Sequence, residues 1–218
     1  MHAVIIGGAT LGGPLDPALL ASADLLIAAD SGADALGAVG LRPHLLVGDM
    51  DSVAEATWRA LEAAGVETHV LPVEKDETDT EVALRLAVDR GADRITLLGA
   101  LGGPRLDHLV AGLLLLTADW LEHVDVCMVD CSHEVRLAHG DVVVDGEPGD
   151  IVSLLPLTPS VHEIDTEGLL YPLRGGSLHQ GAARGVSNEL LGRQARVRHG
   201  EGRLLVIVHR PEGGPHDR

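Results

Sequence analysis

The chain has 218 residues, which is enough for one large domain or two modest ones. Its formal net charge is −17, so the phosphate backbone of a nucleic acid would be repelled. Hydrophobic residues make up 45% of the chain, but it contains no Phe, one Tyr and two Trp. The core must therefore be aliphatic, and the aromatic ladders on which nucleic-acid bases stack are excluded.

Neither the N-terminus nor any apolar run indicates a membrane or secreted protein. Met1-His2 leads directly into apolar residues without a charged leader, and the apolar run from Leu109 to Ala118 is too short to cross a bilayer. Cys127 and Cys131 are too few for a four-ligand zinc site, and idle thiols in a reducing compartment are the simplest interpretation. We therefore expect a cytoplasmic protein with no membrane partner.

Short aliphatic runs alternate with helical patterns over roughly the first 130 residues. The predicted strands are Ala3–Ile6, Leu25–Ala29, Leu45–Val47, Thr68–Leu71, Ile95–Leu98 and Val124–Val129. The predicted helices are Pro17–Ser22, Ala33–Val39, Ala54–Ala64, Thr80–Arg90 and Asp107–Leu121. Because the strands are nearly continuous apolar runs, they fit a sheet covered on both faces. We expect an N-terminal three-layer α/β/α domain with a mostly parallel sheet.

The pattern changes near residue 133, where helical periodicity disappears. β-type runs follow, separated by turns that contain Gly and Pro, and this pattern is typical of an antiparallel β-sandwich. We predict an α/β domain over residues 1–132, a β-sandwich domain over residues 133–210 and a flexible tail over residues 211–218.

Acidic residues follow four of the predicted strands, at the edge where open parallel sheets bind their ligands. They are Asp30 after the second strand, Asp49 and Asp51 after the third, Glu74–Glu81 after the fourth and Asp107 after the fifth. In an extended segment Asp49 and Asp51 would point the same way, and two like charges side by side cost energy unless a cation lies between them. A divalent metal would satisfy both, and it would also reconcile an acidic rim with a phosphate ligand.

Lysine occurs once among the 16 basic residues, and it lies within the densest group of carboxylates. A compact ammonium is not interchangeable with a planar guanidinium where a phosphate is met as a point charge. Lys75 is therefore a candidate phosphate ligand, and an ordinary surface lysine is the alternative.

Helix capping explains some of the same residues without any ligand. The capping candidates are Ser52 with Glu55, Thr78 with Glu81, and Asp30 or Ser31 before the second predicted helix. Complementing a helix dipole is the less favoured alternative for Asp79, which lies in a predicted first turn. A capping residue can have a second role, so these residues remain candidates for the site.

Glycine pairs follow the first and fifth predicted strands, where they would allow a phosphate to approach the backbone. Gly7-Gly8 and Gly12-Gly13 match neither a Walker A loop nor a dinucleotide-binding motif, so tight turns are an alternative. Arg105 follows Gly102-Gly103 at a helix start, where its charge opposes the dipole. A ligand phosphate or an acidic partner would compensate for that placement.

Together these segments resemble the thiamine pyrophosphokinase (thiamin diphosphokinase) family over nearly the whole chain. The segments that carry the resemblance are Asp30–Ala33, Pro43–Ser52, Lys75–Glu81, Gly102–His108, Gly168–Leu173 and Gly185–Glu189. The resemblance implies transfer of a pyrophosphoryl group from ATP to the hydroxyl of thiamine, with release of AMP. It also implies a catalytic α/β domain, a thiamine-binding β-sandwich, and a homodimer with active sites at the subunit interface.

By analogy with the family, Asp49, Asp51 and Asp79 would hold Mg²⁺. Lys75 would offset phosphate charge, and Asp79 or Asp107 would accept the proton of the thiamine hydroxyl. The predicted nucleotide and phosphate site consists of Asp30, Ser31, Gly32, Thr78, Arg105 and Asp107, and the predicted thiamine contacts are Ser187 and Asn188.

Three positions depart from the family pattern. Pro104 looks like an insertion before Arg105, and His44 stands where an aspartate is usual. The tryptophan that follows the Ser-Asn pair in eukaryotic members is missing after Asn188, so the thiamine ring needs another stacking partner or a bacterial variant of the pocket. A metal-dependent nucleotide phosphohydrolase and a non-catalytic sensor of thiamine or nucleotide are the alternative functions.

Overall fold

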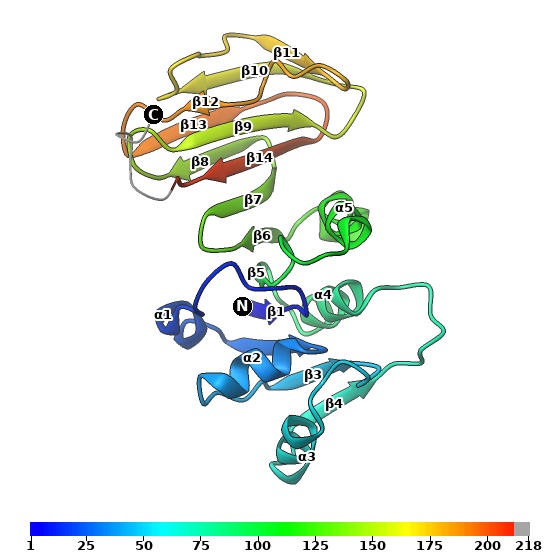
Figure 1. Cartoon of the computed structure of the whole chain (residues 1–218). Helices are drawn as coiled ribbons and strands as arrows, with labels where there is room; N and C mark the ends of the chain where they lie inside the picture. The colour runs from blue at the N-terminus through cyan, green and yellow to red at the C-terminus, as the bar shows by residue number, and fades with distance from the viewer. Residues whose placement is uncertain (212–218) are drawn as a thin grey trace. The chain divides into compact units, whose positions relative to one another are not determined.

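The computed structural model describes residues 1–211, so residues 212–218 of the predicted tail lie outside the described part. The chain forms two compact units (Figure 1). The first unit comprises Met1–Leu115 with His123–Cys131, and the second comprises Leu116–Glu122 with the chain from Ser132 onward. None of the helices within residues 1–211 is long and apolar enough to cross a membrane.

The first unit contains a parallel sheet. Its strands are β1 (His2–Ile6), β2 (Leu25–Ala29), β3 (Leu45–Gly48), β4 (Glu67–Val70), β5 (Arg94–Leu98) and β6 (Asp125–Val129). Their order is β6-β5-β1-β2-β3-β4, and every one of these pairings is parallel. The chain proceeds from β1 to one side of the sheet and returns to the other side at β5, which creates a topological switch point between β1 and β5.

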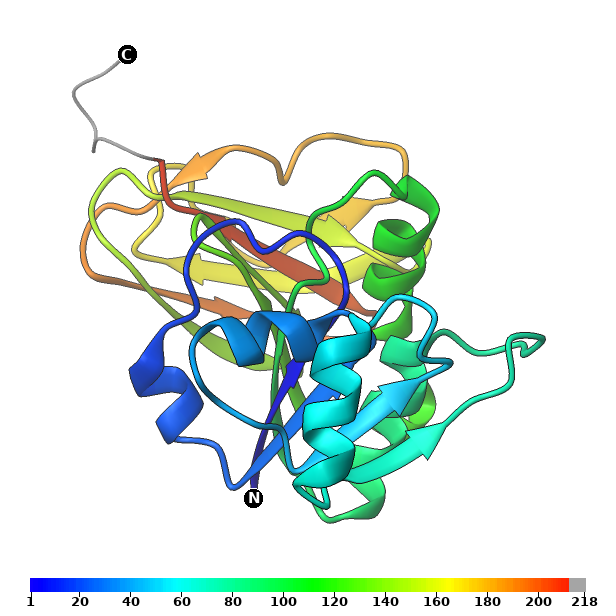
Figure 2. The same ribbon diagram turned by 60° about the horizontal axis from the view of Figure 1, so that its bottom comes forward.

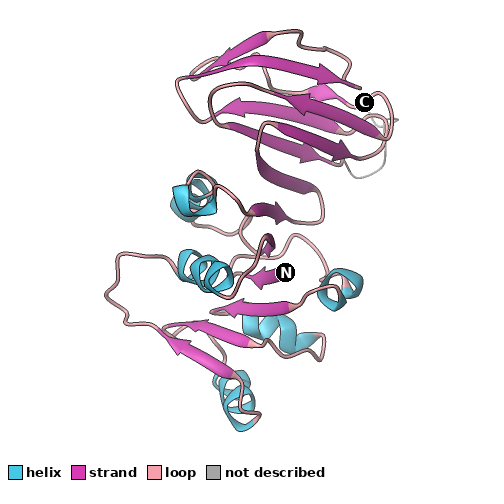
Figure 3. Cartoon of the chain, turned by 180° about the vertical axis from the view of Figure 1, so that it is seen from behind, coloured by secondary structure: helices cyan, strands magenta, loops and turns pink. Residues whose placement is uncertain are grey.

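Helices cover both faces of this sheet, as Figures 1 and 3 show. They are α1 (Pro17–Ala21), α2 (Gly32–Ala38), α3 (Glu55–Ala63), α4 (Asp79–Asp89) and α5 (Leu106–Leu115). Helices α1, α2 and α3 contribute Leu20, Leu36 and Leu61 to a core that contains Val4 and Leu46 of the sheet. Helix α4 packs against β1, β2 and β3 on the other face, with α5 beside it. The predicted three-layer α/β/α architecture is confirmed.

Burial of the strands follows their position in the sheet. Every residue of β1, β2 and β3 is buried, because helices cover these strands on both sides. β4 has no fully buried residue, which is expected of an edge strand (Figure 2). The expectation of strands covered on both faces is therefore wrong for β4.

The last predicted helix of the first domain is too long. Helix α5 ends at Leu115, and a separate 3₁₀ helix, η1 (Asp119–Leu121), follows it. Ala118 interrupts the helix with an extended backbone (φ −64°, ψ 134°). Leu116 and Leu121 are 4% and 1% exposed, so burial of these leucines outweighs the continuous helical propensity of the run.

The second unit consists of two antiparallel sheets. Its strands are β7 (His133–Ala138), β8 (Asp141–Asp145), β9 (Ile151–Pro156), β10 (Ser160–Glu167), β11 (Gly176–His179), β12 (Asn188–Glu189), β13 (Gln194–Arg198) and β14 (Leu204–His209). One sheet has the order β12-β9-β14-β7, and the other has the order β11-β10-β13-β8. Val152 and Val206 of the first sheet share one core with Val161 and Val197 of the second. The predicted β-sandwich is confirmed.

Candidate active site

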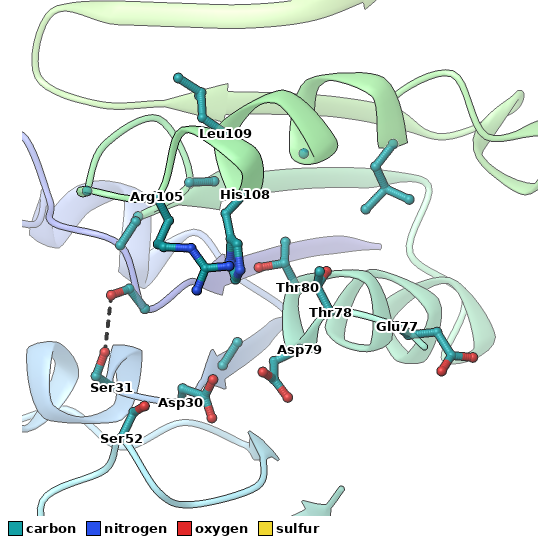
Figure 4. A pocket seen from close by; sticks show the side chains of 18 of the residues that line it. Asp30, Ser31, Ser52, Glu77, Thr78, Asp79, Thr80, Arg105, His108 and Leu109 are labelled. Atoms are coloured by element: carbon teal, nitrogen blue, oxygen red, sulfur yellow. Dashed lines mark hydrogen bonds between the residues drawn. The ribbon is translucent and has the colours of Figure 1, made fainter. Parts of the chain in front are cut away.

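A pocket of about 540 Å³ opens at the carboxyl edge of the parallel sheet, in the first unit (Figure 4). Its walls come from the loops that follow β1, β2, β3, β4 and β5 and from the first turns of α4 and α5. This is the region of the switch point between β1 and β5, where open α/β sheets bind their ligands.

Glycines allow the loops around the pocket to approach one another. A Cβ on Gly7 would lie 2.6 Å from the carbonyl oxygen of Gly99, and one on Gly48 would lie 2.0 Å from Oδ1 of Asp30. Gly8 lines the pocket, whereas Gly12 lies against Cys131 outside it. Of the two predicted N-terminal glycine pairs, only the first reaches the pocket.

Asp30 follows β2 in a left-handed conformation, with φ of 48°. Its backbone N–H donates to the carbonyl of Val47 at 2.9 Å, which fixes the residue beside the end of β3. Among the described residues, Oδ1 of Asp30 is buried without a hydrogen-bond partner. Burial and the nearby carboxylates of Asp79 and Asp49 raise the pKa of Asp30 to about 7. Strain and an unmatched polar atom at one residue are typical of a functional site.

The loop after β3 is not extended, so the condition under which Asp49 and Asp51 would point the same way is not met. Met50 has φ of 67°, and the N–H of Asp51 donates to Oδ1 of Asp49 at 3.1 Å. This bond, together with the charge of Lys75, holds the pKa of Asp49 below its ordinary value. The short polar turn therefore holds the carboxylate of Asp49 beside Lys75 and leaves Asp51 exposed to solvent.

Ser52 is not the cap of α3, so this predicted capping box is wrong. Its hydroxyl donates to Oδ1 of Asp51 at 2.8 Å. Helix α3 begins after Ala54, whose backbone N–H donates to Oδ2 of Asp34 at 3.1 Å. A carboxylate from the neighbouring helix α2 thus binds the N-cap backbone, and sequence spacing gives no signal of it.

Lys75 lies among three carboxylates contributed by different loops. Its Nζ is 3.0 Å from Oδ1 of Asp79 and 3.6 Å from Oδ2 of Asp49. The side chains of Lys75, Asp49 and Asp79 are only 12%, 13% and 22% exposed. Burial lowers the pKa of Lys75, but the carboxylates of Asp79, Asp49 and Asp30 outweigh it and raise the pKa above its ordinary value. Lys75 is therefore not an ordinary surface lysine.

Helix α4 begins at the pocket. The side chain of Thr78 accepts a hydrogen bond from the N–H of Glu81 at 3.1 Å, which confirms the predicted cap. Asp79 is the first residue of the helix, and its carboxylate faces that of Asp30 across the pocket (Figure 4). The N–H groups of this turn favour an anion, so α4 could receive a ligand phosphate.

Ser31 and Gly32 position the start of α2 rather than capping it with a side chain. The hydroxyl of Ser31 donates to the carbonyl of Gly8 at 3.2 Å, as the dashed line in Figure 4 shows, and makes no capping bond. Gly32 is buried, and a Cβ there would lie 2.0 Å from the carbonyl oxygen of Ile6. Gly32 therefore lets α2 pack closely against the end of β1.

Arg105 and Asp107 form an exposed bidentate pair at the start of α5. Nε and Nη2 of Arg105 donate to the two carboxylate oxygens of Asp107 at 2.9 and 2.6 Å. This pair holds the pKa of Asp107 well below its usual range. A ligand phosphate or an acidic partner was predicted to compensate for the charge of Arg105 at a helix start, and the structure shows the acidic partner. Arg105 lines the pocket, and Asp107 does not.

Several pocket residues are missing from the sequence prediction, His108 and Thr80 among them. His108 lines the pocket one turn after Arg105, and Thr80 lines it in the first turn of α4 (Figure 4). The available signal was helical spacing, because residues three apart share a face. That signal is weak without knowing which face of α5 borders the pocket.

The predicted thiamine contacts lie in the second unit. Ser187 has a left-handed backbone with φ of 60°, and its N–H donates to Oγ of Ser153 at 3.1 Å. Oδ1 of Asn188 accepts from the N–H groups of Tyr171 and Glu189, both at 2.9 Å. Nδ2 of Asn188 donates to the carbonyl of Tyr171 at 2.8 Å. The amide of Asn188 is thus engaged with the backbone of another segment.

The donor set beside the pocket fits Mg²⁺. Within residues 1–211, no three His, Cys, Asp or Glu side chains are already arranged as a metal site. Mg²⁺ needs only one or two carboxylates when phosphates and water complete its octahedron. Asp49 and Asp79 converge on one cation, the ammonium of Lys75, and a buried oxygen of Asp30 lacks a hydrogen-bond partner among these residues.

The fold and pocket define the class of open α/β proteins that bind ligands at the carboxyl edge of a parallel sheet. Residues 17–128 match the family described as thiamin pyrophosphokinase, catalytic domain. Residues 132–204 match thiamin pyrophosphokinase, vitamin B1 binding domain. The chain belongs to the thiamin pyrophosphokinase family, which confirms the resemblance found in the sequence.

Individual relatives agree with this assignment. The thiamine pyrophosphokinase of Bacillus subtilis (strain 168) is 30% identical over 186 residues, which cover 84% of this chain and 86% of the relative. The crystal structure of a B. subtilis thiamine pyrophosphokinase superimposes with a TM-score of 0.83 at 27% identity, and covers 96% of this chain and 99% of its own. The structure of the Geobacillus thermodenitrificans enzyme gives 0.81 at 28% identity, with coverages of 98% and 99%.

Proposed function

We propose that this protein is a thiamine diphosphokinase that transfers a pyrophosphoryl group from Mg·ATP to the hydroxyl of thiamine and releases AMP. The observation that carries the proposal is the convergence of Asp49, Lys75 and Asp79 beside the pocket of a chain that belongs to this family. The match to a vitamin B1 binding domain favours thiamine as the acceptor over water. A nucleotide phosphohydrolase would have no use for that domain.

Carboxylates of the first unit would hold the metal. Asp49 and Asp79 already share a cation, and Asp51 lies in the same short turn as Asp49. Bound there with the nucleotide, Mg²⁺ would neutralise the charge of the phosphates. Asp30 completes the acidic group and lies across the pocket from Asp79.

Cationic groups around the pocket would orient the phosphates. Lys75 and Arg105 line it, His108 lies beside them with an imidazole that can form a hydrogen bond, and the first turn of α4 borders it. Phosphoryl transfer depends mainly on positioning and charge neutralisation, so these groups suffice without a covalent intermediate.

The proton of the thiamine hydroxyl needs an acceptor. Asp107 is a weak base while it is paired with Arg105, because the pair lowers its pKa. Asp79 is also paired, with Lys75 at 3.0 Å, so position decides between the two predicted acceptors: the carboxylate of Asp79 faces the pocket, and Asp107 lies outside the lining.

We also propose that the protein is a cytoplasmic homodimer. Leu106, Val110 and Leu114 are spaced four residues apart on α5, and they are 69%, 46% and 54% exposed. Such an apolar stripe would be covered in a dimer. Besides a second copy of the chain, the partners that we propose for the protein are the small molecules ATP and thiamine, with no nucleic acid and no membrane.

The reaction products test the function. Incubation with Mg·ATP should release AMP only when thiamine is present. ADP or phosphate released without thiamine would support a phosphohydrolase, and ligand binding without turnover would support a sensor.

Asp49→Asn tests the role of the carboxylate. We expect kcat to fall by about 100-fold, or about 2.7 kcal/mol. Asp89→Asn, an exposed position at the end of α4, is the matched control and should leave kcat unchanged. Activity of Asp49→Asn within tenfold of the wild type would contradict the proposed role.

A further inference from the structure

Tyr171 is the only tyrosine of the chain, and its side chain projects into solvent. It is 68% exposed, whereas Trp58 and Trp120 are both partly buried. The chain contains no phenylalanine. Leaving its one tyrosine ring largely exposed is costly for a protein with so few aromatic side chains, unless that ring has a ligand.

The backbone of Tyr171 is held from both sides by a single side chain. Asn188 accepts from the N–H of Tyr171 at 2.9 Å and donates to its carbonyl at 2.8 Å. The preceding residue, Leu170, donates its N–H to the carbonyl of Glu189 at 2.9 Å. The ring therefore projects from a backbone fixed by Asn188, and Ser187, the residue before Asn188, is itself in a left-handed conformation. Such preorganisation is useful at a binding site and superfluous on an inert surface.

The same two segments carry most of the exposed apolar side chains of the second unit. Leu170, Val186 and Leu191 are 43%, 43% and 57% exposed, and all lie close in sequence to Tyr171 or Asn188. Outside these segments, Val143 is the remaining large exposed hydrophobic side chain among the described residues of this unit. Exposed apolar side chains on the two segments joined at Tyr171 and Asn188 fit contact with a flat heterocycle.

We infer that Tyr171 is the aromatic contact for the cationic thiazolium ring of thiamine, and that Asn188 positions it. This inference rests on the proposed function, which supplies the ligand. A positive ring over the face of a tyrosine gains cation–π attraction as well as apolar contact. Asn188 then acts through Tyr171, because its amide is occupied by the backbone of Tyr171 and Glu189.

Two substitutions of Tyr171 distinguish the contribution of its aromatic ring to thiamine binding from the contribution of its hydroxyl. Tyr171→Phe keeps the ring and should change the KM for thiamine by less than threefold. Tyr171→Leu keeps an apolar side chain without a ring and should raise that KM about tenfold, with the KM for ATP unchanged. Val143→Ala removes apolar surface elsewhere in the unit and should have no effect. An unchanged KM for thiamine in Tyr171→Leu would overturn the inference.

The charge of the ligand provides a second readout. A thiamine analogue with an uncharged ring in place of the thiazolium should bind the wild type more weakly than thiamine. Tyr171→Leu should reduce the difference in affinity between thiamine and the uncharged analogue, and Asn188→Ala should reduce this difference similarly. A double variant should be little worse than either single variant, because both act on the same ring. Additive effects would overturn the positioning role of Asn188.

Calorimetric titration with thiamine alone keeps this test independent of turnover. If the wild type releases no thiamine-dependent AMP but binds thiamine through Tyr171, the proposed catalysis fails and the inference stands. If AMP is released but Tyr171→Leu binds thiamine normally, the inference fails and the proposed function stands.

Discussion

Lys75→Met removes the ammonium from the carboxylate group while keeping a long, unbranched apolar stem. Nζ lies 3.0 Å from Asp79 and 3.6 Å from Asp49. At an effective dielectric constant of about 20, these pairs contribute roughly 5.5 and 4.6 kcal/mol of attraction before the cost of burying the charges. With 12% exposure for Lys75, the desolvation cost offsets much of that gain.

Removal of one partner from a buried pair costs about 3–5 kcal/mol, because the other charges remain buried and unmatched. Since the carboxylates here keep some solvent contact, we expect the lower end, a loss of about 3 kcal/mol in the free energy of unfolding at pH 8 in EDTA. Mg²⁺ should recover much of this loss, because it provides the missing positive charge. Added Mg²⁺ should therefore stabilise Lys75→Met more than it stabilises the wild type.

Denaturant unfolding measures both the loss of stability in EDTA and the stabilisation by added Mg²⁺. In a Trp120→Phe background the tryptophan fluorescence comes from Trp58 alone, which lies on α3 of the first unit. Arg59→Met breaks an exposed pair with Glu55 and should cost less than about 0.5 kcal/mol, so it is the matched control. The reasoning is refuted if Lys75→Met is as stable as the wild type in EDTA, or if Mg²⁺ stabilises the two proteins equally.

Two further predictions concern Asp30 and Gly32. The pKa of Asp30 is raised from 3.8 to about 7, so the folded protein retains a proton that the unfolded chain has lost. In EDTA, the wild type should therefore lose stability relative to Asp30→Asn as the pH rises from about 4 to 7, by up to about 1.4 kcal/mol per pH unit; parallel stability curves would contradict this. Gly32→Ala should lower the free energy of unfolding by about 1–3 kcal/mol, because its Cβ meets the backbone of Ile6. In the control Gly37→Ala, on the same helix, the added Cβ meets nothing within 4 Å, so this substitution should be neutral or stabilising. Equal shifts of the melting temperature in Gly32→Ala and Gly37→Ala would disprove the packing argument.

Much of the fold follows from local patterns. The predicted strand Leu25–Ala29 agrees with β2, because a run of buried aliphatic residues has few alternatives. The cap at Thr78 was also predictable, since the capping box depends on residues three apart. Ser52 and Glu55 have the same spacing, but there Asp34 supplies the oxygen acceptor from another helix. The length of α5 was mispredicted because tertiary burial ended it.

For the site, the residues could be named but their contacts could not. The sequence indicated that Asp49, Lys75 and Asp79 belong to one edge of the sheet, because parallel strands end together. It did not indicate that Met50 would turn through a left-handed conformation and expose Asp51. His108 was missed for the same reason, since its orientation depends on the packing of α5.

The amino-acid sequence by itself determined the family, the two types of sheet and the rim on which the acidic residues gather, because these depend on periodicity and on residues close together in the chain. Only the tertiary structure decided which charges meet. The raised pKa of Asp30, the ion pair of Lys75 with Asp49 and the attachment of Tyr171 to Asn188 all join residues that are 17 or more positions apart. Contacts of that kind depend on burial and loop geometry, to which each segment's own sequence contributes only in part.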